Sequence, residues 1–125
     1  MKKIKILFII PNLHGGGAQK CFVNLVNNIN LFIFDVKLIV FDTTNSAFIN
    51  DVSTNIEIIN LRKKRVRYGL LKLFTIIKKE KPDVILSTLT QINIPLVFFK
   101  IFLFKKIIFI AREANLVSQN LNRYK

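Results

Sequence analysis

The residues best suited to binding chemistry lie early in the chain, where an apolar run is followed by glycines. The segment LFIIPNLHGGGAQKCF covers residues 7–22, and its glycines are Gly15, Gly16 and Gly17. Apolar residues at helical spacing follow them, so a helix begins close to the glycines. Glycine lets backbone N–H groups approach a ligand closely, and the first turn of a helix carries partial positive charge. The segment therefore predicts a site for phosphate or a similar anion. A turn that serves only helix packing is the alternative.

The spacing of these glycines does not match two common phosphate-binding motifs. A Walker loop needs G-x-x-x-x-G-K-[ST], which HGGGAQKC does not supply. The dinucleotide fingerprint needs a third glycine where Lys20 stands, and four residues separate the predicted strand from Gly15. Asp42, however, ends the second predicted strand about where a ribose-binding acid would lie. A nucleotide-cofactor domain therefore stays open as an alternative.

The composition favours one packed domain with anionic partners. The chain has 125 residues, of which 51% are hydrophobic and 22% charged, as suits a single globular domain over residues 1–125. Twenty Lys and Arg residues against seven Asp and Glu residues give a formal net charge of +13. Such an excess favours phosphates, acidic lipid surfaces or nucleic acid as partners. AT-rich coding is an alternative explanation of the abundant lysine.

Two apolar segments raise the question of membrane insertion or export. The N-terminal run after Lys2 and Lys3 is short and lacks a small-residue cleavage site, which favours a strand over a signal peptide. The run at 94–110 is interrupted by Lys100, Lys105 and Lys106, so no uninterrupted stretch reaches the ~20 residues that a membrane span needs. The lone Cys21 fits a reducing compartment. We therefore expect a cytoplasmic protein.

Apolar runs of strand length alternate with segments of helical periodicity. We expect strands at 4–10, 36–41, 56–59, 83–87 and 106–111, and helices at 18–29, 68–79, 93–104 and 115–124. This alternation predicts an α/β fold with a doubly wound, mostly parallel, Rossmann-like sheet and helices on both faces. Ligands of such sheets bind at the carboxyl ends of the strands. Residues 12–17, 42–44, 87–90 and 112–115 are therefore expected to meet at one edge.

Three segments in this order resemble a known enzyme family. FIIPNLHGGGAQKCFVNLVNNI resembles the opening of glycosyltransferase family 4 enzymes of the GT-B fold, in which a strand, a proline, a short linker, a Gly-Gly-Ala segment and an amphipathic helix follow one another. KKEKPDVILSTL resembles a later Lys-Pro-Asp-Val-Ile segment of the same N-terminal domain. KIIFIAREAN resembles the strand and polar turn that come next. The resemblance extends over nearly the whole chain.

The resemblance implies the N-terminal, acceptor-side half of a GT-B glycosyltransferase. Such enzymes move a sugar from a nucleotide-sugar donor to an acceptor that is often a lipid-linked or surface glycan, and they need no metal and no further cofactor. The donor-binding C-terminal domain, with its Glu-x7-Glu motif, is absent from these 125 residues. We therefore expect an N-terminal half, a truncated reading frame or a split subunit whose second domain comes from another chain, and we expect that the present chain alone is inactive.

The resemblance also implies roles for individual residues. Gly15, Gly16 and Gly17 would lie against the donor diphosphate, and their amides would stabilise charge on the leaving phosphate. Three residues are candidate catalytic groups, of which Arg112 would bind phosphate, Glu113 would orient an acceptor hydroxyl, and His14 would touch the acceptor. A surface salt bridge is the alternative for the first two. The remaining expected substrate-binding residues are polar: Asn12, Gln19, Ser87, Thr88 and Thr90. Gln19 stands where the family commonly has Glu, so the charge of that position is lost.

A second expected surface is basic. LRKKRVR at 61–67 leads into the predicted helix 68–81, and each Lys or Arg near anionic lipid contributes about 1 kcal/mol of membrane affinity. Nucleic acid is not an expected partner, because no recognition motif accompanies the charge and the basic run has one aromatic residue, Tyr68, for stacking. We therefore expect a peripheral position at the inner face of the membrane. A basic membrane adaptor without catalytic activity is the remaining alternative.

Overall fold

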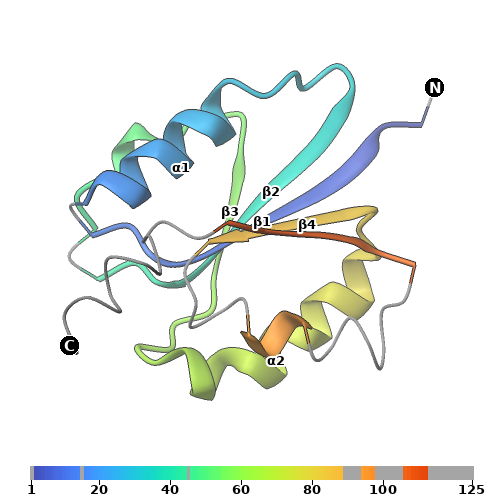
Figure 1. Ribbon diagram of the computed structural model, residues 1–125. Helices are drawn as coiled ribbons and strands as arrows, with labels where there is room; N and C mark the ends of the chain where they lie inside the picture. Colours follow the sequence, from blue (N-terminus) through green and yellow to red (C-terminus); the bar gives the residue numbers. More distant parts are fainter. Residues whose placement is uncertain (1, 15, 45, 89–93, 98–105, 113–125) are drawn as a thin grey trace, which may run out of the picture.

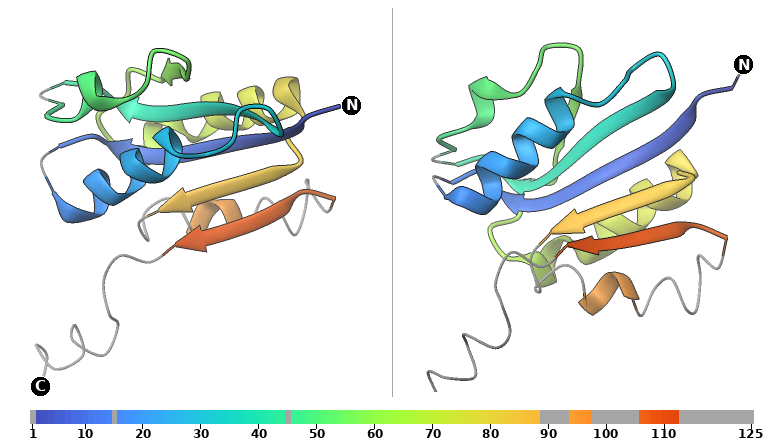
Figure 2. Two further views of the ribbon diagram at one scale, coloured as in Figure 1. Left: turned by 90° about the horizontal axis from the view of Figure 1, so that it is seen from above. Right: turned by 45° about the horizontal axis from the view of Figure 1, so that its top comes forward.

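The structure is a computed structural model, which describes residues 2–14, 16–44, 46–88, 94–97 and 106–112. Its sheet has five strands in the order β3-β2-β1-β4-β5, and every pair of neighbours is parallel. Figure 2 shows the strands pointing in one direction. The strands are β1 (Ile4–Asn12), β2 (Phe34–Asp42), β3 (Glu57–Asn60), β4 (Val84–Thr88) and β5 (Ile108–Arg112); the helices are α1 (Gly17–Asn27), the 3-10 helix η1 (Ile49–Asp51) and α2 (Val66–Glu80). The predicted α/β class with a parallel sheet is confirmed, and the arrangement is consistent with a Rossmann-like fold.

The central strand β1 is apolar on both of its faces. Ile6, Phe8 and Ile10 are buried in one core cluster, whereas Leu7 and Ile9 are buried in another. Side chains alternate across a strand, so these clusters lie on opposite faces of the sheet. The first cluster includes Phe22, Val23 and Val26 of α1, and the second includes Leu73, Phe74 and Ile77 of α2. Figure 1 shows α1 above the sheet and α2 below it.

One close contact fixes α2 against the sheet. Gly69 is buried in the first turns of α2, and a Cβ atom built on it would lie 2.6 Å from the Cδ1 atom of Phe41 at the end of β2. Any larger residue would push the helix away from the ring. This glycine therefore has a packing role, unlike the glycines that precede α1.

The elements differ from the expected ones mainly at their ends. β1 continues through Pro11 to Asn12. The strand accommodates this proline, which has no N–H group, because the pairing with β4 has ended at Ile9 and Pro11 takes no part in the register with β2. The helix expected at 68–79 begins earlier, at Val66. Of the helix expected at 93–104, the structure describes a helical piece at 94–97, and the helix expected at 115–124 lies outside the described residues. Within the described part of the chain, no helix has the length and apolar character needed to cross a membrane.

Candidate functional site

The carboxyl ends of four strands lie along one edge of the sheet. β1 ends at Asn12 opposite Asp42 of β2, and β4 ends at Thr88 opposite Arg112 of β5. β1 and β4 are neighbours, although β2 and β3 come between them in the chain. The order of strands reverses between β1 and β4, which is the place where parallel α/β sheets bind ligands. Four of the expected edge positions therefore meet as the sequence predicts.

The backbone of the glycine turn does not itself require glycine at 16 or 17. Gly16 precedes α1 with φ of -159° and ψ of 159°, an extended conformation that any residue can adopt. Gly17 is the first residue of α1, and a Cβ atom built on it would have no described atom within 4 Å other than its chain neighbours and the backbone of its own helix. The space beside Gly17 is therefore open to a ligand.

Side chains of the described residues do not neutralise the N-terminus of α1. Among these residues no side chain caps the helix, and the first turn of α1 holds no acidic residue. The first N–H groups of a helix have no partner within the helix, so they attract an anion or water. The anion site expected at this turn stays a prediction, which these features of the helix N-terminus favour.

Asn12 holds the polar residues of the turn in place. Its Oδ1 atom accepts a hydrogen bond from the backbone N–H of His14 at 3.1 Å and another from Nε2 of Gln19 at 3.3 Å. These contacts tie the end of β1 to the first turn of α1. Asn12 is therefore in direct contact with two other residues that the sequence selected as catalytic or substrate-binding, His14 and Gln19.

His14 is exposed, and its ring is oriented by the loop after β2. Nε2 of His14 lies 3.0 Å from the carbonyl oxygen of Thr44. A carbonyl oxygen only accepts, so Nε2 carries the proton in this contact and the neutral ring has its lone pair on Nδ1. Nδ1 is accordingly the atom of His14 that would accept a proton from a hydroxyl group.

Asp42 is a carboxylate whose charge is stabilised at this edge. Its Oδ1 atom accepts hydrogen bonds from the hydroxyl of Thr44 at 2.8 Å and from the Thr44 backbone N–H at 3.1 Å. These two bonds, in that order of importance, hold the pKa of Asp42 below its ordinary value, and the charge of Lys64 adds to the effect. One oxygen of the Asp42 carboxylate is thus engaged by Thr44.

The end of β4 contributes two buried hydroxyl groups. Ser87 and Thr88 are both 0% exposed, and the Oγ1 atom of Thr88 has no hydrogen-bond partner among the described residues. Val84 and Leu86 pack against the core cluster that includes α1. Because side chains alternate along a strand, Thr88 faces the α1 side as well, at the same edge as the glycine turn. A buried hydroxyl without a partner is uncommon in folded proteins.

Of the other expected site residues, one is described by the structure and three are not. Arg112 is partly buried at the end of β5, beside Thr88. Gly15, Thr90 and Glu113 lie outside the described residues. The structure therefore brings Asn12, His14, Gly16, Gly17 and Gln19 together at the end of β1, and Ser87, Thr88 and Arg112 at the neighbouring strand ends.

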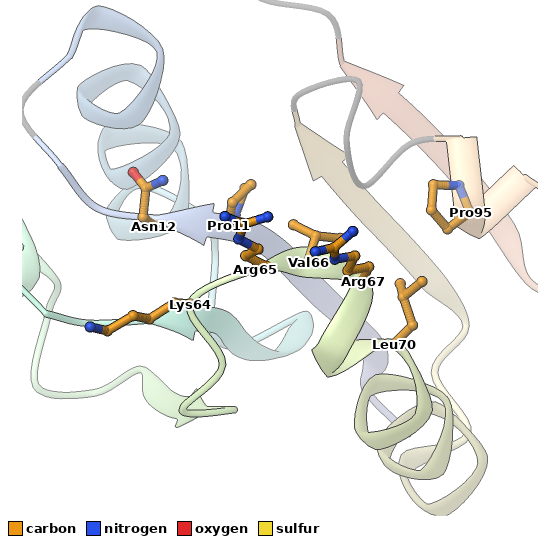
Figure 3. A pocket seen from close by; sticks show the side chains of 8 residues that line it. All are labelled: Pro11, Asn12, Lys64, Arg65, Val66, Arg67, Leu70 and Pro95. Atoms are coloured by element: carbon orange, nitrogen blue, oxygen red, sulfur yellow. The ribbon is translucent and has the colours of Figure 1, made fainter.

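A basic cavity at the same edge was not among the expected binding sites. Its volume is about 520 Å³, and it lies between the end of β1 and the first turns of α2 (Figure 3). The residues that line it are Pro11, Asn12, Lys64, Arg65, Val66, Arg67, Leu70 and Pro95. The sequence signal for it was the run LRKKRVR, which we expected to form only an outer surface. The chain passes from β3 into α2 through this run, and this connection places the run beside β1. Sequence spacing alone does not reveal that position.

Comparisons with protein-family models, with curated proteins and with solved structures found no match to this chain.

Proposed function

We propose that this chain is the N-terminal, acceptor-side domain of a GT-B glycosyltransferase, acting together with a donor-binding domain. In this proposal a sugar moves from a nucleotide-sugar donor to a lipid-linked or surface-glycan acceptor. The observation that carries it is the uncapped N-terminus of α1 beside the open Gly17, at the point where the strand order reverses. The resemblance of the three sequence segments then selects glycosyl transfer from among the reactions of phosphate-bearing substrates.

Two further features of the site support the proposed transfer, one for the donor diphosphate and one for the acceptor. The unpaired Oγ1 of Thr88 is a hydrogen-bond donor on the α1 side of the same edge. His14 has a fixed ring orientation, which suits contact with an acceptor hydroxyl. Backbone N–H groups aimed at a leaving diphosphate stabilise the charge that develops as the glycosidic bond to the donor breaks.

A gene-deletion strain of the source organism provides the test. Membranes and cytosol from this strain would supply the donor-binding partner and the acceptor, and labelled UDP-sugars and GDP-sugars would be added one at a time. We expect that purified wild-type chain restores the transfer of label into lipid-extractable or polysaccharide material, and that the Gly17→Ala variant does not. If no sugar is transferred in a manner that depends on the chain, the proposal is wrong.

A nucleotide-cofactor domain is the second candidate, and the position of Asp42 at the end of β2, opposite Asn12, favours it. The two candidates differ in the ligand that binds to the edge. Tight binding of NAD or a related dinucleotide, reduced by the Asp42→Asn variant, would favour the cofactor domain. Binding of nucleoside diphosphates that is unaffected by this variant would favour the transferase.

The outer face of α2 supports a peripheral membrane position. Leu71 is 82% exposed and Tyr68 is 61% exposed, and basic residues surround them on the helix and in the segment before it. Apolar side chains that project from a basic helix suit the interface of an anionic bilayer. Co-sedimentation with anionic vesicles that falls as salt rises, without comparable binding to an oligonucleotide, is the expected result. Equal binding to both would instead favour a nonspecific polycation.

A further inference from the structure

The basic cavity at the start of α2 has the chemistry of an anion site with an apolar wall. Lys64, Arg65 and Arg67 supply positive charge, and no acidic residue is among the described residues that line the cavity. The ion pairs of the described residues join Lys5 and Lys37 to Glu80 and Glu57, and none of them includes the cations of the cavity. The positive charge of this cavity is therefore not neutralised by an ion pair within the described protein.

The position of these cations adds to the field in the cavity. Arg65 immediately precedes α2 and Arg67 is in its first turn, which has neither a capping side chain nor an acidic residue. The partial positive charge of the helix N-terminus therefore acts in the same place as the two guanidinium groups. Guanidinium groups bind phosphate oxygens in pairs of parallel hydrogen bonds. Two contacts with Tyr68 orient the guanidinium group of Arg67. Nη2 of Arg67 donates a hydrogen bond to the Tyr68 hydroxyl at 3.0 Å, and the guanidinium carbon lies 4.8 Å from the centre of the Tyr68 ring.

The rest of the wall is apolar. Val66 and Leu70 of α2 face the cavity together with Pro11 at the end of β1 and Pro95 of the helical piece at 94–97. Figure 3 shows Pro95 on the opposite side of the cavity from Asn12. A cavity with cations beside apolar residues fits a ligand that has both a phosphate group and a hydrocarbon group.

We propose that this cavity binds a phosphate or diphosphate monoester whose organic group is apolar. The phosphate lies against Arg65 and Arg67, and the hydrocarbon group lies against Leu70 and Pro95. Asn12 lines the cavity and also holds Gln19 of α1, so the bound molecule lies next to the glycine turn. That this molecule is the sugar acceptor rests on the proposed function, whereas the binding of the phosphate ester does not.

Octyl phosphate below its micelle concentration is a suitable probe, with inorganic phosphate and octyl glucoside as comparisons. Binding to the full chain would be measured by titration calorimetry and by amide chemical shifts. We expect octyl phosphate to bind about tenfold more tightly than inorganic phosphate, because the octyl group buries apolar area. Octyl glucoside, which has no phosphate, is expected to bind more weakly than either. Equal affinity for octyl phosphate and octyl glucoside would overturn the proposal.

Variants separate a specific site from general positive charge. The double variant Arg65→Ala with Arg67→Ala is expected to bind octyl phosphate about tenfold more weakly. The matched control is Lys78→Ala with Lys79→Ala, which removes the same charge from the last turn of the same helix. All four side chains are exposed, so both proteins are expected to fold as the wild type does. Equal weakening by both double variants would contradict the proposal. The Leu70→Ser variant is expected to reduce the preference for octyl phosphate over inorganic phosphate.

Two competition measurements identify whether the phosphate comes from a lipid headgroup or from a soluble ester. Vesicles that contain phosphatidic acid present a phosphate monoester at a membrane, and soluble octyl phosphate presents it in solution. If octyl phosphate displaces the protein from these vesicles but not from phosphatidylglycerol vesicles of equal charge, the site takes lipid headgroups. If the vesicles do not compete for octyl phosphate, the site takes soluble phosphate esters. A chain that binds octyl phosphate but transfers no sugar contradicts the proposed function and leaves this site intact.

Discussion

The side-chain amide of Gln19 in the first turn of α1 donates a hydrogen bond to Oδ1 of Asn12 at the end of β1. The same Asn12 oxygen accepts the N–H of His14. One side chain therefore fixes both sides of the segment that contains the glycine turn. This arrangement links the end of β1 to the first turn of α1, and it gives the described residues around the turn distinct and testable roles.

Substitutions of Asn12 separate its structural role from the charge of the site. Asn12→Ala removes the acceptor of two hydrogen bonds and is expected to destabilise the protein by about 1 to 2 kcal/mol. Asn12→Asp keeps the acceptor oxygen, so we expect a free energy of unfolding close to that of the wild type. It also adds negative charge at the turn, so pyrophosphate is expected to bind at least severalfold more weakly. Urea unfolding and calorimetric titration measure the two effects. A stable Asn12→Asp variant that binds pyrophosphate normally would contradict the placement of the anion.

Gly17→Ala is expected to block the ligand while it preserves the fold. The new methyl group meets no protein atom within 4 Å, and alanine favours a helix more than glycine does. The free energy of unfolding is therefore expected to be unchanged or to rise by up to about 1 kcal/mol. Binding of pyrophosphate is expected to fall, because the methyl group occupies the space beside the N–H groups. The control is Gly16→Ala, whose methyl group would lie 2.6 Å from Oε1 of Gln19 and would displace that side chain rather than the ligand. Full ligand binding by Gly17→Ala would show that no ligand approaches this residue.

Thr88→Val tests the meaning of the unpaired hydroxyl at the end of β4. Replacement of an unsatisfied buried hydroxyl by a methyl group of similar size removes a desolvation penalty. We therefore expect the variant to be about 1 kcal/mol more stable than the wild type, with weaker binding of pyrophosphate or a nucleoside diphosphate. Ser87 is equally buried and has a partner within the protein, so Ser87→Ala is the matched comparison and is expected to be destabilising. A loss of stability in Thr88→Val would indicate that the hydroxyl has a structural role.

An ion-pair network at the opposite end of the sheet predicts how stability depends on pH. The Glu80 carboxylate at the end of α2 lies 2.9 Å from the Lys5 ammonium and 3.0 Å from the Lys37 ammonium. Its side chain is only 13% exposed. Hydrogen bonds from Lys5 and then from Lys37 hold the pKa of Glu80 below its ordinary value of 4.5, and the bond to Glu80 is the main cause of a raised Lys37 pKa.

A carboxylate with a lowered pKa stabilises the fold above its unfolded pKa and loses this contribution as pH falls through the folded value. The stability that Glu80 provides is therefore fully present above pH 4.5 and declines below it. Lys37 also stabilises the fold, but the pH dependence of its contribution has the opposite sign. Because the Lys37 pKa is raised, this contribution is fully present below pH 10.5 and declines as pH rises above it. We expect Glu80→Gln to destabilise the protein by about 1 to 2 kcal/mol at neutral pH and to reduce the acid sensitivity of unfolding. The control Glu57→Gln removes a mostly exposed partner of the same Lys37 and is expected to have a small effect. Equal effects of the two variants would contradict the network.

The sequence predicted most of the strands and the edge at which they end, because buried parallel strands have apolar runs that need no alternation. It also identified the glycine turn and its neighbours Asn12, His14 and Gln19. It did not reveal that Gly69 packs on Phe41, because a helical glycine has no local signal of its tertiary contact. The basic cavity was missed for a related reason. The run at 61–67 indicates charge, but only the crossing from β3 to α2 brings Arg65 beside Pro11.

The most direct measurement is an amide chemical-shift titration of the isotopically labelled chain with inorganic pyrophosphate and then with UDP and GDP. The account predicts that the largest saturable shifts fall on the amides of Gly17, Ala18 and Gln19, and that Gly17→Ala removes them while its spectrum elsewhere stays that of the folded protein. Shifts that are confined to the lysine-rich surfaces, with no change at the start of α1, would contradict it.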